Sequence, residues 1–94
     1  MVLELALIDV TPGSEQAFAA AYAQAKELVG DTPGCRSMRM TRGVETPTRF
    51  GLLVEWDSVE DHQVFRDSDR FPQWRELVGP HFAAPPQFEH YVDL

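Results

Sequence analysis

The chain has 94 residues, of which 44% are hydrophobic and 11% aromatic, a composition that excludes a disordered protein. A chain this short buries only about 60% of the surface of its unfolded state, so we expect one domain over residues 1–94 with a marginal core. The net charge of −7 argues against nucleic acid as a partner, because basic side chains supply most of the affinity for a phosphate backbone.

The chain begins with a predicted strand and a predicted helix. Residues 2–10 are rich in Val, Leu and Ile, which indicates a strand that is largely buried on both faces. Pro12 and Gly13 end this strand. Between Ser14 and Gly30 the apolar residues recur at helical spacing and predict an amphipathic helix with one buried stripe: Phe18, Ala21, Tyr22, Ala25, Leu28 and Val29.

Two further strands are predicted next. Residues 35–44 and 49–56 alternate in character as half-buried strands do, and the short loop between them favours an antiparallel pair. The second of these strands places its largest side chains on one face: Phe50, Leu52, Val54 and Trp56.

A helical region in two parts follows. Ser58 is a typical helix-capping residue, with Asp61 three residues on, and Val59, His62 and Phe65 then share one helical face that we expect to look inward. A second helix carries the stripe Phe71, Trp74, Leu77 and Val78 and is expected to stop at Gly79-Pro80. Residues 81–86 are predicted to be a loop and residues 87–94 a last strand.

The order β-α-β-β-α-β predicts an α+β, ferredoxin-like fold with helices on one face of a four-stranded antiparallel sheet. The other face of the sheet is apolar in places and has no cover within the chain. We therefore expect a homodimer, in which two protomers pack through their open sheet faces.

The sequence predicts a cytoplasmic protein without a membrane partner. No apolar run approaches the roughly 18 residues that span a bilayer, and the first residues lack the basic and apolar regions of a signal peptide. The single cysteine, Cys35, permits no internal disulfide, which suits a reducing compartment.

Short motifs near the ends of the predicted elements extend over nearly the whole chain: Pro12-Gly13, Pro33-Gly34, residues 52–56 followed by Ser58, then Phe71 and Trp74, and His90-Tyr91 after Pro85-Pro86. With these motifs the chain resembles the antibiotic biosynthesis monooxygenase family. The resemblance implies a dimeric α+β barrel. Members of that family include cofactor-independent oxygenases of polyphenols and quinols, haem-degrading enzymes and enzymes that degrade signal molecules.

The haem-degrading branch of this family uses an asparagine, a tryptophan and a histidine. The resemblance places these three residues near Ala6, Phe65 and Arg75, so none of the three residue types matches. This departure argues against haem degradation, and a titration without a Soret band would exclude haem binding. The chain instead carries its helix-two histidine one turn earlier than Phe65, at His62.

The candidate site combines a histidine with large aromatic side chains. We expect His62 to act as the catalytic base, since an inward imidazole beside an apolar pocket can accept a phenolic proton. The alternative is a core or interface histidine that is hydrogen-bonded to a carbonyl or to an acid. The predicted substrate-binding residues are Tyr22, Trp56, Phe65, Trp74 and His81, with His81 at the rim.

No metal or cofactor site is predicted. The three histidines, His62, His81 and His90, are 19 and 9 residues apart and form none of the usual metal-binding spacings. We therefore expect a monooxygenase that oxidises a small, planar, quinol-like or polyphenol-like substrate without metal, flavin or haem. The alternative is a barrel of the same kind that binds a small molecule without catalysis, or acts as an isomerase.

Overall fold

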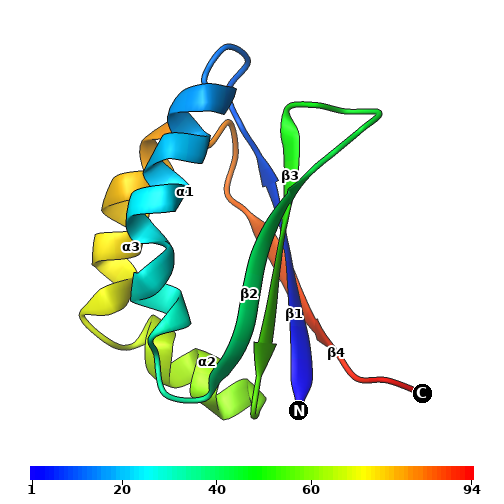
Figure 1. Ribbon diagram of the computed structural model, residues 1–94, viewed down its shortest axis with the longest axis vertical. Coiled ribbons are helices and arrows are strands. Elements are labelled where there is room, and N and C mark those ends of the chain that lie inside the picture. Colours follow the sequence, from blue (N-terminus) through cyan, green and yellow to red (C-terminus); the bar gives the residue numbers. More distant parts are fainter.

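The computed structural model describes residues 1–94 and confirms the ferredoxin-like α+β fold. The three helices cover one face of a single sheet and leave the other face bare (Figure 1). The elements in chain order are β1 (Val2–Asp9), α1 (Glu15–Gly30), β2 (Cys35–Arg42), β3 (Arg49–Trp56), α2 (Val59–Arg66), α3 (Arg70–Val78), the 3₁₀ turn η1 (Gly79–His81) and β4 (Gln87–Tyr91).

The sheet has the strand order β2-β3-β1-β4, and every neighbouring pair is antiparallel. β1 is therefore a central strand that pairs with the third and with the last strand of the chain. In this register Glu4 lies opposite Val54 on one side and opposite His90 on the other. Strand pairing thus places a carboxylate and an imidazole side by side on the face that the helices cover.

The core lies between that face and the helices, because strand side chains alternate between the two faces. Even-numbered residues of β1 and β3 point to the helices, and Trp56, Val54 and Phe18 are completely enclosed there. Odd-numbered residues point to the bare face, where Leu7 is 42% exposed. The expectation that β1 is buried on both faces is therefore wrong for one protomer, since nothing in the chain covers the second face.

Helix α1 packs through the predicted stripe. Phe18, Ala21, Ala25 and Val29 are buried, while Tyr22 and Leu28 are half-buried at the margin of the stripe. The helix contains neither proline nor an internal glycine, which favours its uninterrupted length of 16 residues.

Helix α2 begins as predicted. The Ser58 hydroxyl accepts a hydrogen bond from the backbone N–H of Asp61 and donates one to the Asp61 carboxylate, at 3.2 and 2.9 Å. His62 and Phe65 point inward and are buried. Val59 is instead 43% exposed, because it occupies the first turn, beyond the last core residue of β3.

Several boundaries differ from the prediction, and the strand predicted over residues 2–10 ends at Asp9. The strand predicted over residues 35–44 ends at Arg42, and the strand predicted over residues 87–94 ends at Tyr91, whose partner Leu3 lies almost at the start of β1. The chain also continues past Val78 in the η1 turn, because proline is tolerated in the first residues of a helical turn, where its missing N–H is not needed.

The bare face of the sheet carries a band of apolar side chains: Leu3, Leu5, Leu7, Leu53 and Tyr91. No helix of the chain has the length and hydropathy needed to cross a bilayer.

Candidate active site

A buried carboxylate and two histidines meet between the sheet and α2. Glu4 comes from β1, His62 from α2 and His90 from β4, with the indole of Trp56 at the end of β3 beside them. His62 Nδ1 lies 2.8 Å from His90 Nε2, and His62 Nε2 lies 3.4 Å from Glu4 Oε1. Glu4 Oε1 also accepts a hydrogen bond of 2.9 Å from the indole N–H of Trp56.

His62 is neutral in this setting. Burial, followed by repulsion from His90 and Arg66, lowers the pKa of His62 from 6.5 to about 4. Because His62 is neutral, its 3.4 Å contact with Glu4 is a polar contact rather than an ion pair. The His62 ring also stacks on Trp56, with centroids 5.1 Å apart and planes at 17°.

One arrangement of protons satisfies every contact in this cluster. We infer it from the hydrogen-bond pattern, since a neutral imidazole has one donor and one acceptor nitrogen. We place the proton of His62 on Nε2, which faces Glu4 Oε1 at 3.4 Å, so that Nδ1 accepts the hydrogen bond of His90 Nε2. The three side chains therefore form a polar row in which the proton of His62 faces the Glu4 carboxylate.

Glu4 has the properties of a general base. Burial raises the pKa of its carboxyl above 4.5, although the hydrogen bond from Trp56 and the charge of Arg66 oppose the shift. Both protein contacts fall on Oε1, so Oε2 has no partner in the chain. Every fully buried side-chain oxygen or nitrogen of the protein has a hydrogen-bond partner. Glu4 Oε2 has none, so it is not fully buried and is open to the cavity that Glu4 lines.

This cavity has a volume of about 220 Å³ and lies between the sheet and the helices α2 and α3. Its inner wall is buried and mostly apolar, with Glu4 and His62 as its polar members, and includes Ala6, Ile8, Leu52 and Trp74. The outer wall is formed by more exposed side chains, among them Arg66, Arg75, Pro85 and Phe88. The arrangement offers an apolar slot with an acid–base group at its inner end.

The structure places two predicted site residues, His62 and Trp74, on the wall of this cavity. Three others stand directly behind wall residues. Trp56 lies behind His62, Phe65 packs edge-on against Phe71 at 5.8 Å, and Tyr22 packs edge-on against Trp74 at 6.3 Å. His81 lies in η1, away from the wall, where its carbonyl accepts a hydrogen bond from Thr11.

The comparisons with known proteins agree with this fold. Residues 1–77 match the family model of antibiotic biosynthesis monooxygenases. The chain belongs to this family. A crystal structure from Bordetella bronchiseptica, provisionally named an antibiotic biosynthesis monooxygenase, is 42% identical and superposes with a TM-score of 0.95, covering 99% of this chain and 96% of that one.

More distant relatives extend the comparison. The Bacillus subtilis protein YczJ, which is uncharacterised, is 32% identical over 95 residues and matches the full length of both chains. A 42.8 kDa protein in the whiE locus of Streptomyces coelicolor is 32% identical over 63 residues, which cover 67% of this chain and 16% of that protein. A Nitrosomonas europaea structure with 22% identity and a TM-score of 0.85 shares the fold.

The structure separates the three positions that the resemblance aligned with the haem-degrading set. Ala6 and Arg75 line the cavity, whereas Phe65 is buried behind it. No group of three or more His, Cys, Asp or Glu side chains is arranged to hold a metal ion.

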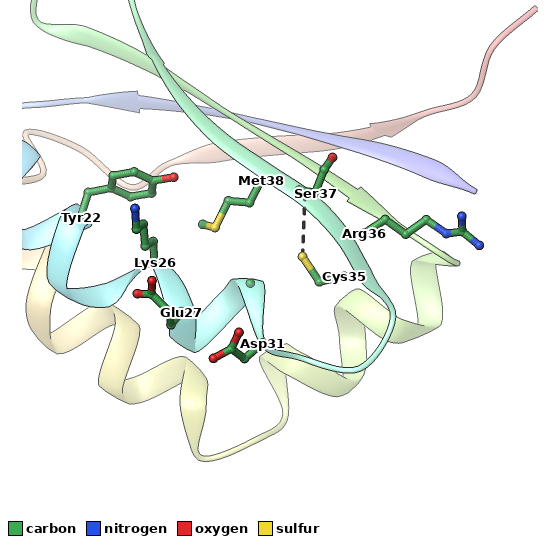
Figure 2. Close-up of a pocket in the computed structure, with 9 residues that line it drawn as sticks. Tyr22, Lys26, Glu27, Asp31, Cys35, Arg36, Ser37 and Met38 are labelled. Atoms are coloured by element: carbon green, nitrogen blue, oxygen red, sulfur yellow. Dashed lines mark hydrogen bonds between the residues drawn. The ribbon is translucent and has the colours of Figure 1, made fainter.

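A second depression, of about 310 Å³, lies where the end of α1 faces the start of β2 (Figure 2). Figure 2 shows Tyr22 entering it from α1, and Cys35 joined to Ser37 by a long contact of 3.8 Å. Burial raises the pKa of the Cys35 thiol, which disfavours the reactive thiolate. Lys26 and Glu27 give its walls charges of both signs, so the depression offers no directed acid–base group like Glu4.

The sequence did not single out Glu4, Arg66, Arg75 or Phe88 as site residues. Glu4 is an isolated acid in an apolar strand, and its partner Trp56 is 52 positions away. The available signal was a charged residue at a buried position of a strand, because such a residue needs a polar partner. Arg66 and Arg75 carried no motif at all.

Proposed function

We propose that this protein is a monooxygenase that oxidises a small, planar, quinol-like substrate in the cavity beside Glu4, without metal, flavin or haem. The observation that carries the proposal is the free Oε2 of a buried Glu4 at the inner end of an apolar cavity. His62 assists this proton transfer, since it borders the same cavity and lies 3.4 Å from the other carboxylate oxygen.

The chemistry needs little from the protein beyond a base and a dry pocket. The substrate hydroxyl gives its proton to Glu4, and the phenolate then passes one electron to O₂. The two radicals combine into a ring hydroperoxide, which loses water and leaves a carbonyl. One quinol and one O₂ thus give one hydroxyquinone and one water, and the substrate supplies all four electrons.

Within this proposal, His62 and His90 keep Glu4 competent. The Nε2–H of His62 stabilises negative charge on Oε1, and the hydrogen bond from His90 fixes the tautomer that makes this donation possible. Membership of the antibiotic biosynthesis monooxygenase family supports the reaction class. The small cavity supports a compact substrate, because drug-sized ligands occupy pockets of roughly 300–1,000 Å³.

Oxygen uptake tests the proposal. The purified protein should consume O₂ with a substituted hydroquinone faster than the uncatalysed reaction, and His62→Ala should lower turnover at least about tenfold. Val64→Ala, on an exposed position of the same helix, is the matched control and should retain full activity. A quinol that binds without oxygen uptake would instead favour the binding or isomerase alternative, and an unchanged His62→Ala rate would remove His62 from the mechanism.

We further propose that two copies pack through the bare sheet face. Leu7 and Tyr91 are 42% and 44% exposed there, and one protomer has no element that could cover them. Sedimentation equilibrium should give the mass of two chains at micromolar concentration. A single-chain mass at that concentration would contradict the dimer.

A further inference from the structure

Two arginines face the cavity without an acidic partner. Arg66, in the last turn of α2, and Arg75, in α3, both line it, and neither forms an ion pair with a carboxylate of the chain. Arg36, Arg42 and Arg49 each lie within 4.0 Å of an acid, whereas Arg39 and Arg70 also lack an ion pair but lie outside this cavity. What distinguishes Arg66 and Arg75 is that they share one cavity, where two guanidinium groups without an ion pair favour an anionic ligand.

Aromatic side chains hold both guanidinium groups at the cavity. Arg66 Cζ lies 4.7 Å from the ring centroid of Phe88, and Arg75 Cζ lies 5.7 Å from that of Phe71. These ring contacts use none of the N–H donors for a carboxylate of the chain. Those donors match the two oxygens of a carboxylate in a bidentate fashion.

The positions of the charges give the cavity a direction. Glu4 and His62 are buried at the inner wall, with 6% and 5% exposure, whereas Arg66, Arg75 and Phe88 belong to the exposed outer wall. A carboxylate would be repelled by an ionised Glu4 and attracted by the arginines. A ligand with a hydroxyl at one end and a carboxylate at the other would therefore enter with the hydroxyl foremost.

From this geometry we infer that the cavity takes a compact aromatic carboxylate with a free ring hydroxyl, whose carboxylate is bound by Arg66 and Arg75 while its hydroxyl reaches Glu4. That this ligand is then oxidised rests on the proposed function, whereas its binding does not. A cavity of about 220 Å³ suits a ligand of one or two rings.

Equilibrium binding under anaerobic conditions separates the two claims, because it requires no turnover. The probes are 2,5-dihydroxybenzoate and its methyl ester, and binding is followed by calorimetry or by the fluorescence of the two tryptophans, Trp56 and Trp74. We expect the acid to bind at least about tenfold more tightly than the ester, since hydrogen bonds to charged groups contribute about 1.5–3 kcal/mol. Raising the salt concentration should weaken binding of the acid and leave binding of the ester unchanged.

Substitutions test whether Arg66 and Arg75 cause the preference for the acid. Arg66→Gln and Arg75→Gln should each weaken binding of the acid about tenfold and change ester binding less than twofold. Arg70→Gln, an arginine of α3 that does not line the cavity, is the matched control and should bind both probes as the parent chain does. Equal affinity for acid and ester, no saturable binding of the acid at millimolar concentration, or the same loss in Arg70→Gln would overturn the inference. Selective binding of the acid without oxygen uptake would retain it and reject the oxygenase proposal.

Discussion

Glu4→Gln is expected to lower quinol oxygenation by about 10²-fold or more, the usual range for removal of a general base. Glutamine keeps the shape of the side chain, and its carbonyl oxygen can still accept the hydrogen bond from Trp56, but it cannot take a proton. The measurement is the initial rate of oxygen uptake at saturating quinol. Glu60→Gln, an exposed acid in the first turn of α2, is the control and should change the rate less than twofold.

The pH dependence of the rate gives a second test of Glu4 as the base. Because burial raises the pKa of Glu4, kcat/KM of the parent enzyme should rise with pH through an apparent pKa above 4.5 and level off once the carboxylate is ionised. Glu4→Gln should lose this rise. A variant that retains both the parent rate and the parent pH profile would show that Glu4 is not the base.

The largest expected effect on stability is that of Trp56→Ala. The indole is completely enclosed, stacks on His62 and packs at a tilt against Phe65, so its removal leaves a large cavity and leaves Glu4 Oε1 without the indole donor. Loss of a buried tryptophan costs about 3–5 kcal/mol, a large part of the roughly 5–15 kcal/mol that stabilises a typical domain. We expect Trp56→Ala to unfold at much lower urea concentration than the parent chain.

Trp56→Phe separates the two contributions, because phenylalanine keeps most of the ring and removes the N–H. Its expected cost is about 1–3 kcal/mol, chiefly the loss of the hydrogen bond to a buried carboxylate. Urea unfolding followed by the fluorescence of the remaining Trp74 measures both variants. Equal midpoints for Trp56→Ala and Trp56→Phe would contradict a packing role for the indole.

The sequence predicted the architecture well because the dominant signals are local. The Ser58 cap, the helical stripe from Phe18 to Val29 and the alternation in residues 49–56 each depend on neighbours only a few positions away. These patterns fixed the order of elements, and the ferredoxin-like topology followed from that order. The inward direction of His62 could be predicted for the same reason.

The candidate site was harder to predict, because it depends on contacts between distant strands. Glu4 meets His90 only through the pairing of β1 with β4, and neither residue carries a motif. The exact places of the predicted aromatic side chains were also hard to predict. Helical spacing placed Tyr22 and Phe65 on inward faces, but it could not decide which ring forms the cavity wall and which supports it from behind.

Isotope labelling tests the central claim most directly. Protein treated with a chelator, and shown to be free of flavin and haem, is incubated with a hydroquinone under ¹⁸O₂, and the product is analysed by mass spectrometry. Cofactor-free oxygenation at the Glu4 cavity predicts one ¹⁸O atom in each hydroxyquinone and the other in water, with Glu4→Gln slowing the labelling by the same factor as oxygen uptake. An unlabelled quinone formed together with hydrogen peroxide, or labelling that disappears after chelation, would contradict it.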